Sequence, residues 1–560
     1  MDKYKYEHIF DLLKENFNFD EIKYKKYIKD IIHLLMESEK NGETFIDIDD
    51  KLHSFELEGD GWPEKHIEAL EDTGLILSSD SPFILQDRKL SFIKWSKKVN
   101  KILNLLIKKL NNNQINQKIF RPQNKVNKGY KIIELFNKSD LVLLQGGPGT
   151  GKSTLILEII SYYLTQNHSI NIGLSAPTGK ASSRLKESLD KKKKSDLKYD
   201  LENIECQTLH RWIYNSINKS NKLKFNLKEL DFFVIDEMSM VNINIIESIL
   251  NLLADDCKLL LVGDANQLPP INNCSIWNYI FTYSKKSIFD SSIVNLKKVY
   301  RNNGDIEKLS KLIFKKEDNL FKSKVFRIMN NESSSNVNIS KNFNKLIPEE
   351  LIDKINFHIN NLRKSVEILS RKKNIFTESI DNLYDLEKEL LLNIFKKLNS
   401  QLVLCQTNSG IWSVNEINKI ILEQSDHYDF FKMNEGIPVM CTENNNELGI
   451  SNGDIGVIIG KGSLRRFLFR KFNKINKQEA SLIEPNRLEN IVPALAITIH
   501  KSQGSESDNV NILWKQNLNI SDPHIANKSG ILLKDNFEKR LFYTAITRAK
   551  KNLHLYYLNT

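Results

Sequence analysis

The stretch Leu141-Val-Leu-Leu-Gln-Gly-Gly-Pro-Gly-Thr-Gly-Lys-Ser-Thr154 contains a complete G-x-x-x-x-G-K-S pattern. An apolar run precedes the pattern and helix-forming residues follow it, which predicts a strand, a loop and a helix. Glycines at this spacing let backbone N–H groups turn toward a phosphate chain, and the following helix adds its N-terminus. The sequence therefore predicts a nucleoside triphosphate site at Gly146, Gly147, Pro148, Gly149, Thr150, Gly151, Lys152, Ser153 and Thr154.

Within this loop, Lys152 offers a positive charge to the phosphates and the Ser153 hydroxyl is a candidate ligand for Mg²⁺. A second nucleotide element is predicted at Asp231-Phe-Phe-Val-Ile-Asp236-Glu237, where an apolar run ends in two acids. We expect Asp236 to hold the metal with Ser153, and Glu237 to orient or deprotonate the attacking water. Taken alone, the acidic pair also fits a solvated turn after a strand.

The composition is that of a soluble globular protein, with 560 residues, 40% hydrophobic and 27% charged. Apolar stretches fall short of the roughly 20 residues that a membrane span needs, and the first residues lack a signal-peptide core, which predicts a cytoplasmic location. The five cysteines are widely spaced and form no C-x-x-C pair, so neither a disulfide framework nor a zinc or iron–sulfur site is predicted.

The net charge of +11 favours a polyanionic partner, because Lys and Arg contacts with phosphates release counterions. A general enrichment in Lys, Asn and Ile offers a second explanation of that charge. The run Lys191–Lys194 is accordingly interpreted as a solvated loop.

Helical spacing of apolar residues at His8–Leu13 and Tyr27–Leu35 predicts a helical N-terminal domain over residues 1–112, with a linker at Asn111–Gln117. From about residue 118, short apolar strands alternate with helical patterns, which is typical of parallel α/β sheets. The strands predicted for a first core are Leu141–Gln145, Ile170–Ser175, Phe232–Asp236 and Leu259–Gly263, and those for a second core are Leu402–Cys405, Ala494–Ile499 and Leu553–Tyr557.

Residues 302–400 are predicted to be a Lys-rich helical insertion without recognisable chemistry. Short strands and turn residues at Gly436–Met440 and Gly449–Gly460 predict a small β module inserted in the second core. The predicted division is 1–112, 113–291, 292–435, 436–489 for the β module, and 490–560 for the end of the second core.

Four further segments follow in order: Gly263–Pro270, Tyr300-Arg301, Ile499–Glu506 and Tyr543–Ala549. Each alone fits an ordinary loop or helix. Together with the phosphate loop, the ordered set resembles superfamily 1 helicases over most of residues 118–560. The resemblance implies two RecA-like parallel-sheet motor domains with ATP and Mg²⁺ bound between them, and an SH3-like fold for the β module.

The resemblance also implies roles for individual residues. Gln267 would sense the terminal phosphate, and Arg301 and Arg548 would stabilise charge on the phosphates in the transition state. His210 or Trp212 would stack on a base, although core packing is an equally good interpretation of Trp212. The set implied to contact DNA is Pro177, Thr178, Lys180, His210, Trp212, His500, Lys501 and Ser502.

Within the superfamily, Thr208-Leu-His, Asn452-Gly-Asp-Ile-Gly456 and His500-Lys-Ser-Gln-Gly-Ser-Glu506 resemble the RecD family, the alpha subunits of the bacterial exodeoxyribonuclease V (RecBCD) complex. This implies 5′-to-3′ movement on DNA, strand gripping by the β module, and RecB-like and RecC-like partners, the latter contacting the N-terminal domain. Nuclease activity would lie in a partner chain, because no spaced Asp, Glu and Lys constellation stands out.

The family's adenine-reading glutamine has no clear counterpart, because Gln123 is displaced from the expected position. Two other functions remain open at the level of sequence. One is a stand-alone superfamily 1 helicase, and the other is a non-catalytic nucleotide-binding scaffold. Both arginines and both acids are present, which disfavours the scaffold.

Overall fold

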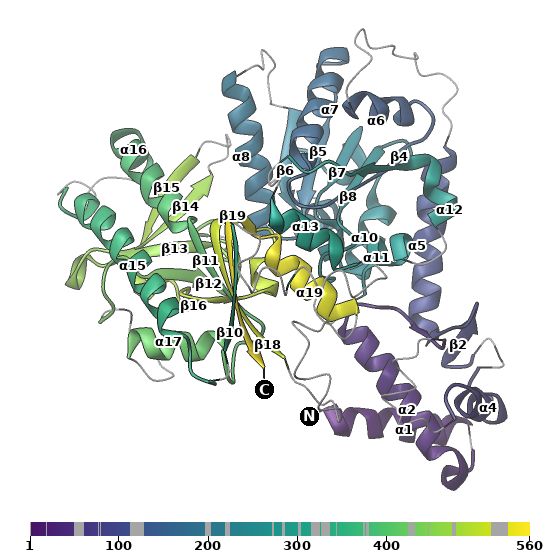
Figure 1. Ribbon diagram of the computed structural model, residues 1–560. Coiled ribbons are helices and arrows are strands. Elements are labelled where there is room, and N and C mark those ends of the chain that lie inside the picture. Colours follow the sequence, from purple (N-terminus) through teal and green to yellow (C-terminus); the bar gives the residue numbers. More distant parts are fainter. Residues whose placement is uncertain are drawn as a thin grey trace. The chain divides into compact units, whose positions relative to one another are not determined.

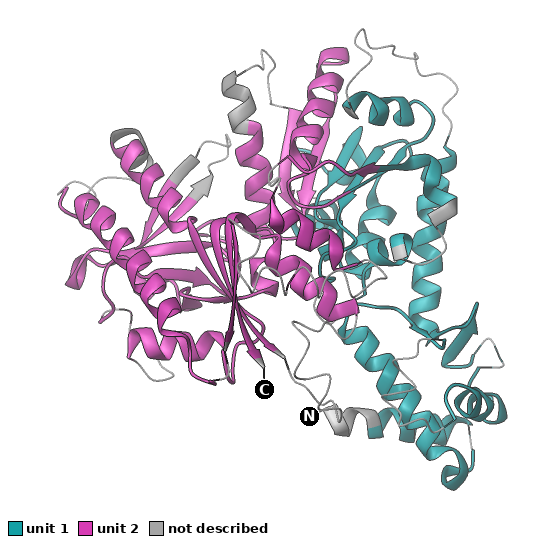
Figure 2. Ribbon diagram, viewed as in Figure 1, with its two compact units in different colours: residues 1–145, 209–294 teal, residues 146–208, 295–560 magenta. Residues whose placement is uncertain are grey.

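The chain divides into two compact units (Figure 2), unit 1 with residues 1–145 and 209–294 and unit 2 with residues 146–208 and 295–560. The structure is a computed structural model. It describes residues 2–17, 19–49, 61–76, 78, 80–112, 128–195, 203–218, 224–270, 274–282, 286–300, 304–314, 325, 336–342, 344–372, 376, 380–423, 430, 432–445, 447–472, 478–516 and 536–559.

The N-terminal part of unit 1 is mainly helical, as predicted (Figure 1). Helices α1 (Asp2–Phe17), α2 (Glu21–Lys40) and α4 (Glu64–Asp72) share an apolar core with a small antiparallel sheet. That sheet has the order β1-β3-β2, formed by Ile46–Asp47, Lys89–Phe92 and Phe83–Gln86.

Helix α5 (Ile93–Asn111) also lies within the predicted N-terminal region, but it packs against the strands of the first core. Its apolar residues Trp95, Val99, Ile102 and Leu106 recur at helical spacing and are buried in the same cluster as strand residues of that core. Burial on one side therefore fixes α5 to the motor sheet.

Unit 1 contains three parallel strands in the order β7-β8-β4, namely Phe232–Ile235, Lys258–Gly263 and Leu141–Gly146. These strands are continuous apolar runs, as is typical of parallel strands that helices cover. Helices α9 (Leu209–Asn218) and α10 (Ile243–Leu252) contribute residues to the same apolar cluster as the strands. Unit 2 contains the parallel pair β5 (Ile172–Ala176) and β6 (Ile204–Thr208) with helices α7 (Lys152–Gln166) and α8 (Gly179–Ser195).

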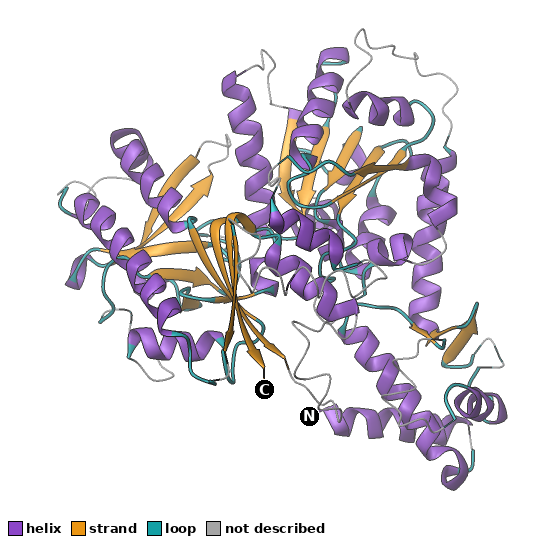
Figure 3. Cartoon of the chain, viewed as in Figure 1, coloured by secondary structure: helices purple, strands orange, loops and turns teal. Residues whose placement is uncertain are grey.

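The second sheet lies in unit 2 and is parallel throughout, in the order β10-β19-β18-β11-β17. Helices α13, α17 and α19 belong to the same unit. Figure 3 shows the helices and strands of the chain in separate colours. The prediction of an α/β fold with two parallel-sheet motor cores is confirmed. The strands are Val337–Asn342, Ala549–Asn559, Ser507–Gln516, Gln401–Cys405 and Ile497–Thr498, and the helices are Asp305–Leu312, Val414–Leu422 and Asn536–Ile546.

The β module forms an antiparallel sheet in the order β15-β14-β13-β12-β16. Helices α15 (Glu349–Ser370) and α16 (Ile380–Leu398), from the segment predicted to be a helical insertion, share an apolar cluster with this sheet. The same segment also contains β10, a strand that was predicted as part of a helical region. The module strands are Gln478–Ile483, Arg466–Phe472, Ile455–Ile459, Pro438–Cys441 and Ile491–Pro493.

Among the described residues, we find no helix with both the length and the apolar character needed to cross a bilayer.

Candidate functional site

The phosphate loop adopts the conformation that its glycines permit. Gly149 and Gly151 have φ values of +73° and +87°, in the left-handed region that glycine enters without a steric penalty. Gly151 immediately precedes α7, so the first N–H groups of this helix emerge from the loop. Ser153 and Thr154 are exposed in that first turn. These features fit a bound phosphate chain.

Lys152 lies over the loop rather than extending away from it. Its Nζ donates hydrogen bonds to the carbonyl oxygens of Gly146 at 2.7 Å and Gly147 at 3.1 Å. The Thr150 hydroxyl donates to the same Gly147 oxygen at 2.8 Å. The Lys152 ammonium therefore lies against the backbone of the loop. Phosphate oxygens of a bound nucleotide would compete with the two carbonyl oxygens for its hydrogen bonds.

Tyr300 contacts the loop, which the sequence had not indicated. Its backbone N–H donates to the Gly149 oxygen at 2.9 Å, and its ring lies 3.8 Å from where a Cβ on Gly151 would stand. Tyr300 is 63% exposed, and Lys298 Nζ lies over its ring at 5.1 Å from the centroid. Arg301, the next residue, lies outside the described residues.

The predicted acid pair follows β7. Asp236 is buried, with an exposed fraction of 8%, and its Oδ1 accepts a hydrogen bond from the Glu237 N–H at 2.8 Å. Glu237 has φ +54° and ψ +45°, a left-handed conformation that is uncommon for residues other than glycine and gathers at functional sites. Among the described residues, its buried Oε2 has no hydrogen-bond partner. An acceptor kept free in this way fits a water-orienting role for Glu237.

The segment after β8 is organised by Gln145 at the end of β4. Gln145 donates to Asp264 at 3.4 Å and accepts from the Ala265 N–H at 3.2 Å and from Trp277 Nε1 at 3.1 Å. Gln267 is buried and donates to Asp264 Oδ2 at 3.3 Å. Gln267, the residue predicted to sense the terminal phosphate, is therefore held by Asp264. Asp264 is in turn held by Gln145, which lies one residue before the phosphate loop.

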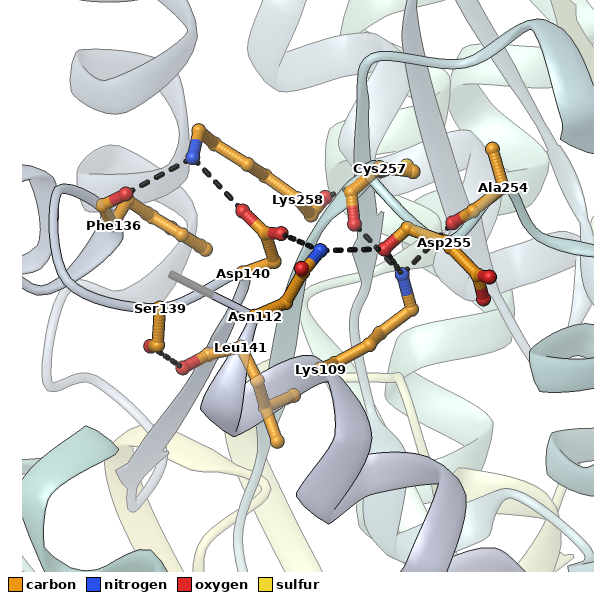
Figure 4. A network of polar contacts seen from close by, with 10 residues as sticks. All are labelled: Lys109, Asn112, Phe136, Ser139, Asp140, Leu141, Ala254, Asp255, Cys257 and Lys258. Carbon is orange, nitrogen blue, oxygen red and sulfur yellow. Dashed lines mark hydrogen bonds and ion pairs between the residues drawn. The ribbon is translucent and has the colours of Figure 1, made fainter. Parts of the chain in front are cut away.

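A buried polar network holds the opposite end of β4 (Figure 4). Lys109, at the end of α5, donates to the carbonyl oxygens of Ala254 at 2.9 Å, Asp255 at 3.3 Å and Cys257 at 2.9 Å. Asp140 accepts from Lys258 at 3.0 Å and from Asn112 at 2.7 Å. This network therefore holds the N-terminal end of β4, and the phosphate loop follows directly after the C-terminal end of the same strand.

Replacing Lys109 by alanine is expected to lower the stability of unit 1 by about 1–3 kcal/mol, because the carbonyl oxygen of the buried Cys257 and those of Ala254 and Asp255 lose a charged donor. Burial lowers the pKa of Lys109, which shows that its ammonium is largely removed from water where it holds these oxygens. The measurement is the melting temperature of the full chain. Lys108→Ala is the matched control, because that lysine is exposed and forms a surface ion pair with Asp255, which contributes little. Equal melting of the two variants would contradict the prediction.

The predicted DNA-contacting segment before α8 has a defined cap. The Thr178 hydroxyl accepts from the Ala181 N–H at 3.2 Å, so it fixes the start of the helix. Pro177 and Lys180 are partly buried beside it. Lys180 donates to the Gly453 oxygen of the β module at 3.4 Å. Both sides of this contact belong to unit 2.

The second predicted DNA segment separates two residues that the sequence left as alternatives. His210 is exposed at the start of α9. Trp212 is fully buried in the motor core, and its ring meets Phe233 edge-on at 5.6 Å. The structure therefore favours core packing for Trp212 and leaves His210 available to a base.

The segment after β17 is mostly enclosed. Ser502 is fully buried and donates to the Ile499 oxygen at 2.6 Å. His500 stacks on Phe537 with 6.0 Å between ring centroids, and burial lowers the pKa of His500. Burial also lowers the pKa of Lys501.

Arg548 is 2% exposed and lies between α19 and β19. Its guanidinium donates to the Thr544 oxygen at 3.0 Å and to the Ser505 oxygen at 3.2 Å. The arginine is thus held inside unit 2 in a fixed orientation, rather than on a freely moving surface side chain.

Comparisons with known proteins agree with these motifs. The model of the AAA domain matches residues 130–273, and that of the UvrD-like helicase C-terminal domain matches residues 298–560. The RecBCD enzyme subunit RecD of Buchnera aphidicola subsp. Acyrthosiphon pisum is 31% identical over 528 residues, 86% of this chain and 82% of that protein. The subunit from Buchnera aphidicola subsp. Schizaphis graminum is 31% identical over 461 residues, 76% of this chain and 71% of that protein.

Among solved structures, a Pif1 helicase from Bacteroides in complex with ADP-AlF3 and single-stranded DNA is 17% identical, with a TM-score of 0.38 and coverage of 77% of this chain and 92% of that one. The sequence relatives, and not this likeness, decide the family. At 31% identity over 82% of the length of a curated relative, the chain belongs to the RecD family of superfamily 1 ATP-dependent helicases.

Proposed function

We propose that this chain is the 5′-to-3′ helicase subunit of a RecBCD-type complex, unwinding double-stranded DNA ends for recombination and repair with RecB-like and RecC-like partners in the cytoplasm. The observation that carries its motor role is the phosphate loop closed by Lys152, together with the unpartnered carboxylate oxygen of Glu237 among the described residues. A scaffold needs neither.

The proposed site assigns ATP to Gly146–Thr154 and Mg²⁺ to Ser153 and Asp236. When bound, the metal neutralises charge that develops on the phosphates. Glu237 orients the attacking water and accepts its proton, while Lys152 binds phosphate oxygens. Gln267 reports the state of the terminal phosphate, and Arg301 and Arg548 stabilise its transition-state charge.

The proposed DNA contacts are Pro177, Thr178, Lys180, His210, His500, Lys501 and Ser502, with His210 in preference to Trp212 for stacking. The proposed domain division remains 1–112, 113–291, 292–435, 436–489 and 490–560, with an SH3-like fold for the β module. Because α5 packs on the motor core, we assign partner docking to the elements that precede it.

The test uses duplexes with a single-stranded tail at either the 5′ or the 3′ end, and the full chain co-expressed with RecB-like and RecC-like subunits. To isolate this motor, the RecB-like subunit carries an inactivated phosphate loop. We expect co-purification of the three chains and unwinding from the 5′ tail only. Unwinding by the chain alone with no partner association would favour the stand-alone helicase, and association without ATP hydrolysis would favour the scaffold.

Tyr300 adds a nucleotide contact to this proposal. A largely exposed aromatic ring beside a phosphate loop suits stacking on the base of the nucleotide, which would lie on the ring face away from Lys298. We expect Tyr300→Ala to raise KM for ATP by about 10-fold, since a stacking contact is worth roughly 1–3 kcal/mol. Tyr300→Phe keeps the ring and should leave KM within about 2-fold of the starting value. Steady-state ATPase assays decide the point, and equal KM values for the two variants would exclude stacking.

A further inference from the structure

The start of α8 is in close contact with the turn between β12 and β13 of the β module. A Cβ placed on Gly179 would lie 1.9 Å from the Ser451 hydroxyl oxygen, so only a glycine fits against this turn. Next to it, Lys180 Nζ lies 3.4 Å from the Gly453 carbonyl oxygen. Two consecutive residues of a predicted DNA-contacting segment are therefore covered by the β module.

The turn that covers them is rigid. The Ser451 N–H donates to Asp454 Oδ2 at 2.7 Å, and the Asp454 N–H donates to the Ser451 oxygen at 3.0 Å. The Gly453 N–H donates to the Cys441 oxygen at 2.8 Å, and Gly453 has φ +87°. Asp454 is thus held in place by its own turn and by strand β12.

Positive charge exceeds negative charge around this contact. The charges of Arg184 and Arg548 act on Lys180 and disfavour its protonated form, whereas Asp454 favours it. Burial, with these two arginines, lowers the pKa of Lys180 to about 8, and burial raises the pKa of Asp454 to about 6. Glu506 is a second nearby anion, and Arg184 and Lys550 both lie 3.8 Å from it. Farther along α8, Glu187 pairs with Arg470 of the β module at 2.6 Å.

One hydroxyl here also lacks a partner. Ser505 is 7% exposed, and among the described residues its Oγ makes no hydrogen bond. The neighbouring Gly504 lies against Ala181 of α8, with 3.8 Å between the Ala181 Cβ and a Cβ built on Gly504. An anionic oxygen at this place would accept a hydrogen bond from the Ser505 hydroxyl and would be attracted by the surrounding positive charges.

We propose that the Asp454 carboxylate, held by the Ser451 N–H one residue beyond the Gly453 oxygen that Lys180 contacts, supplies negative charge that a DNA backbone phosphate would replace, so that the Ser451–Asp454 turn acts as a latch that single-stranded DNA must displace. This inference rests on the proposed function, because it assigns Lys180 to the DNA strand. The contact of Lys180 itself that DNA must replace is the 3.4 Å contact with the Gly453 oxygen, which is long for a hydrogen bond and therefore weak. The ion pair of Arg470 with Glu187 lies farther along α8 and need not break. The latch lowers affinity for DNA without blocking it.

Asp454→Asn tests the latch. Asparagine keeps an oxygen that accepts from the Ser451 N–H, so the turn is preserved while the charge is lost. We expect the full chain to bind a fluorescently labelled oligo(dT) about 5-fold more tightly than before, the lower end of typical coupling between sites. Asp508→Asn is the matched control, because it removes the same charge from an exposed pair with Lys551 and should leave affinity unchanged.

Coupling to Lys180 separates a latch from a structural effect. In a Lys180→Ala background, Asp454→Asn should change affinity by less than about 2-fold, since the cation on which the Asp454 charge acts is gone. Lys180→Ala itself should reduce the dependence of log affinity on log salt by about 0.7, the loss of one phosphate contact on a single strand. A gain that persists without Lys180 would overturn the latch.

The remaining outcomes are also decisive. If Asp454→Asn and Asp508→Asn tighten binding equally, the gain is a general effect of net charge and the latch is wrong. If Asp454→Asn leaves affinity unchanged, Asp454 does not compete with DNA. Should the asparagine variant melt early, Asp454→Ser carries the same test, because its hydroxyl also accepts from Ser451. Absence of oligo(dT) binding by the unsubstituted chain would instead refute the proposed DNA function.

Discussion

Replacing Lys152 by glutamine is expected to lower DNA-stimulated ATP hydrolysis by about 100-fold or more, the scale on which a single transition-state charge contact acts. Lys152 already lies on the Gly146 and Gly147 carbonyl oxygens, so its ammonium is held at the loop before nucleotide arrives. Glutamine keeps a donor at that place and removes the charge. The expected loss is therefore in kcat, with a smaller effect on nucleotide affinity.

The measurement is phosphate release by the full chain with and without oligo(dT). Lys138→Gln is the control, because Lys138 is an exposed lysine shortly before β4 and its loss changes net charge equally. Both variants should melt at the temperature of the unsubstituted chain. Hydrolysis that survives Lys152→Gln would mean that the loop does not perform the chemistry, and the motor assignment of this chain would have to be given up.

Glu237→Gln is the second large effect. We expect kcat for ATP hydrolysis to fall by about 10²–10⁴-fold, the usual contribution of a positioned general base. We expect a loss of catalysis without a loss of folding. The buried Oε2 has no hydrogen-bond partner among the described residues, and the glutamine amide places a group of similar size in the same space. Nucleotide binding should therefore survive.

Two readouts distinguish this outcome from misfolding. Binding of a fluorescent ATP analogue should stay within about 3-fold of the unsubstituted chain, since only a step after binding is affected. Single-turnover hydrolysis should slow by the same factor as the steady state. Loss of analogue binding in parallel with activity would assign Glu237 to holding the loop and not to the water.

Much of the motor fold is predictable because buried parallel strands are short, continuous apolar runs. Leu141–Gln145 was predicted and β4 covers Leu141–Gly146, and Phe232–Asp236 corresponds to β7 at Phe232–Ile235. Ala494–Ile499 was too long, because β17 is only Ile497–Thr498. The apolar run continues beyond the residues that pair with β11, and composition alone does not show where pairing ends.

The features that escaped prediction depend on contacts between distant segments. Strand β10 alternates Val337 and Ile339 with polar residues over a short length, a weak signal within a Lys-rich segment. Likewise, α5 carries an ordinary amphipathic pattern that does not identify which core covers it. Trp212 illustrates the same limit, because an aromatic residue in a motif suits stacking on DNA as well as it suits the core.

The position of Arg548 has a mechanical consequence. Strand β19, which begins one residue later, pairs with β18 from Ala549 to Asn559, with a register irregularity between Ser507 and Asn509, and with β10 from Leu553 to Leu558. Arg548 therefore stands at the end of a strand that lies between two others for about half of its length. In the role proposed for Arg548, a displacement of its guanidinium would be passed on to the sheet that contains β19 and β18, and would not be absorbed by a long loop.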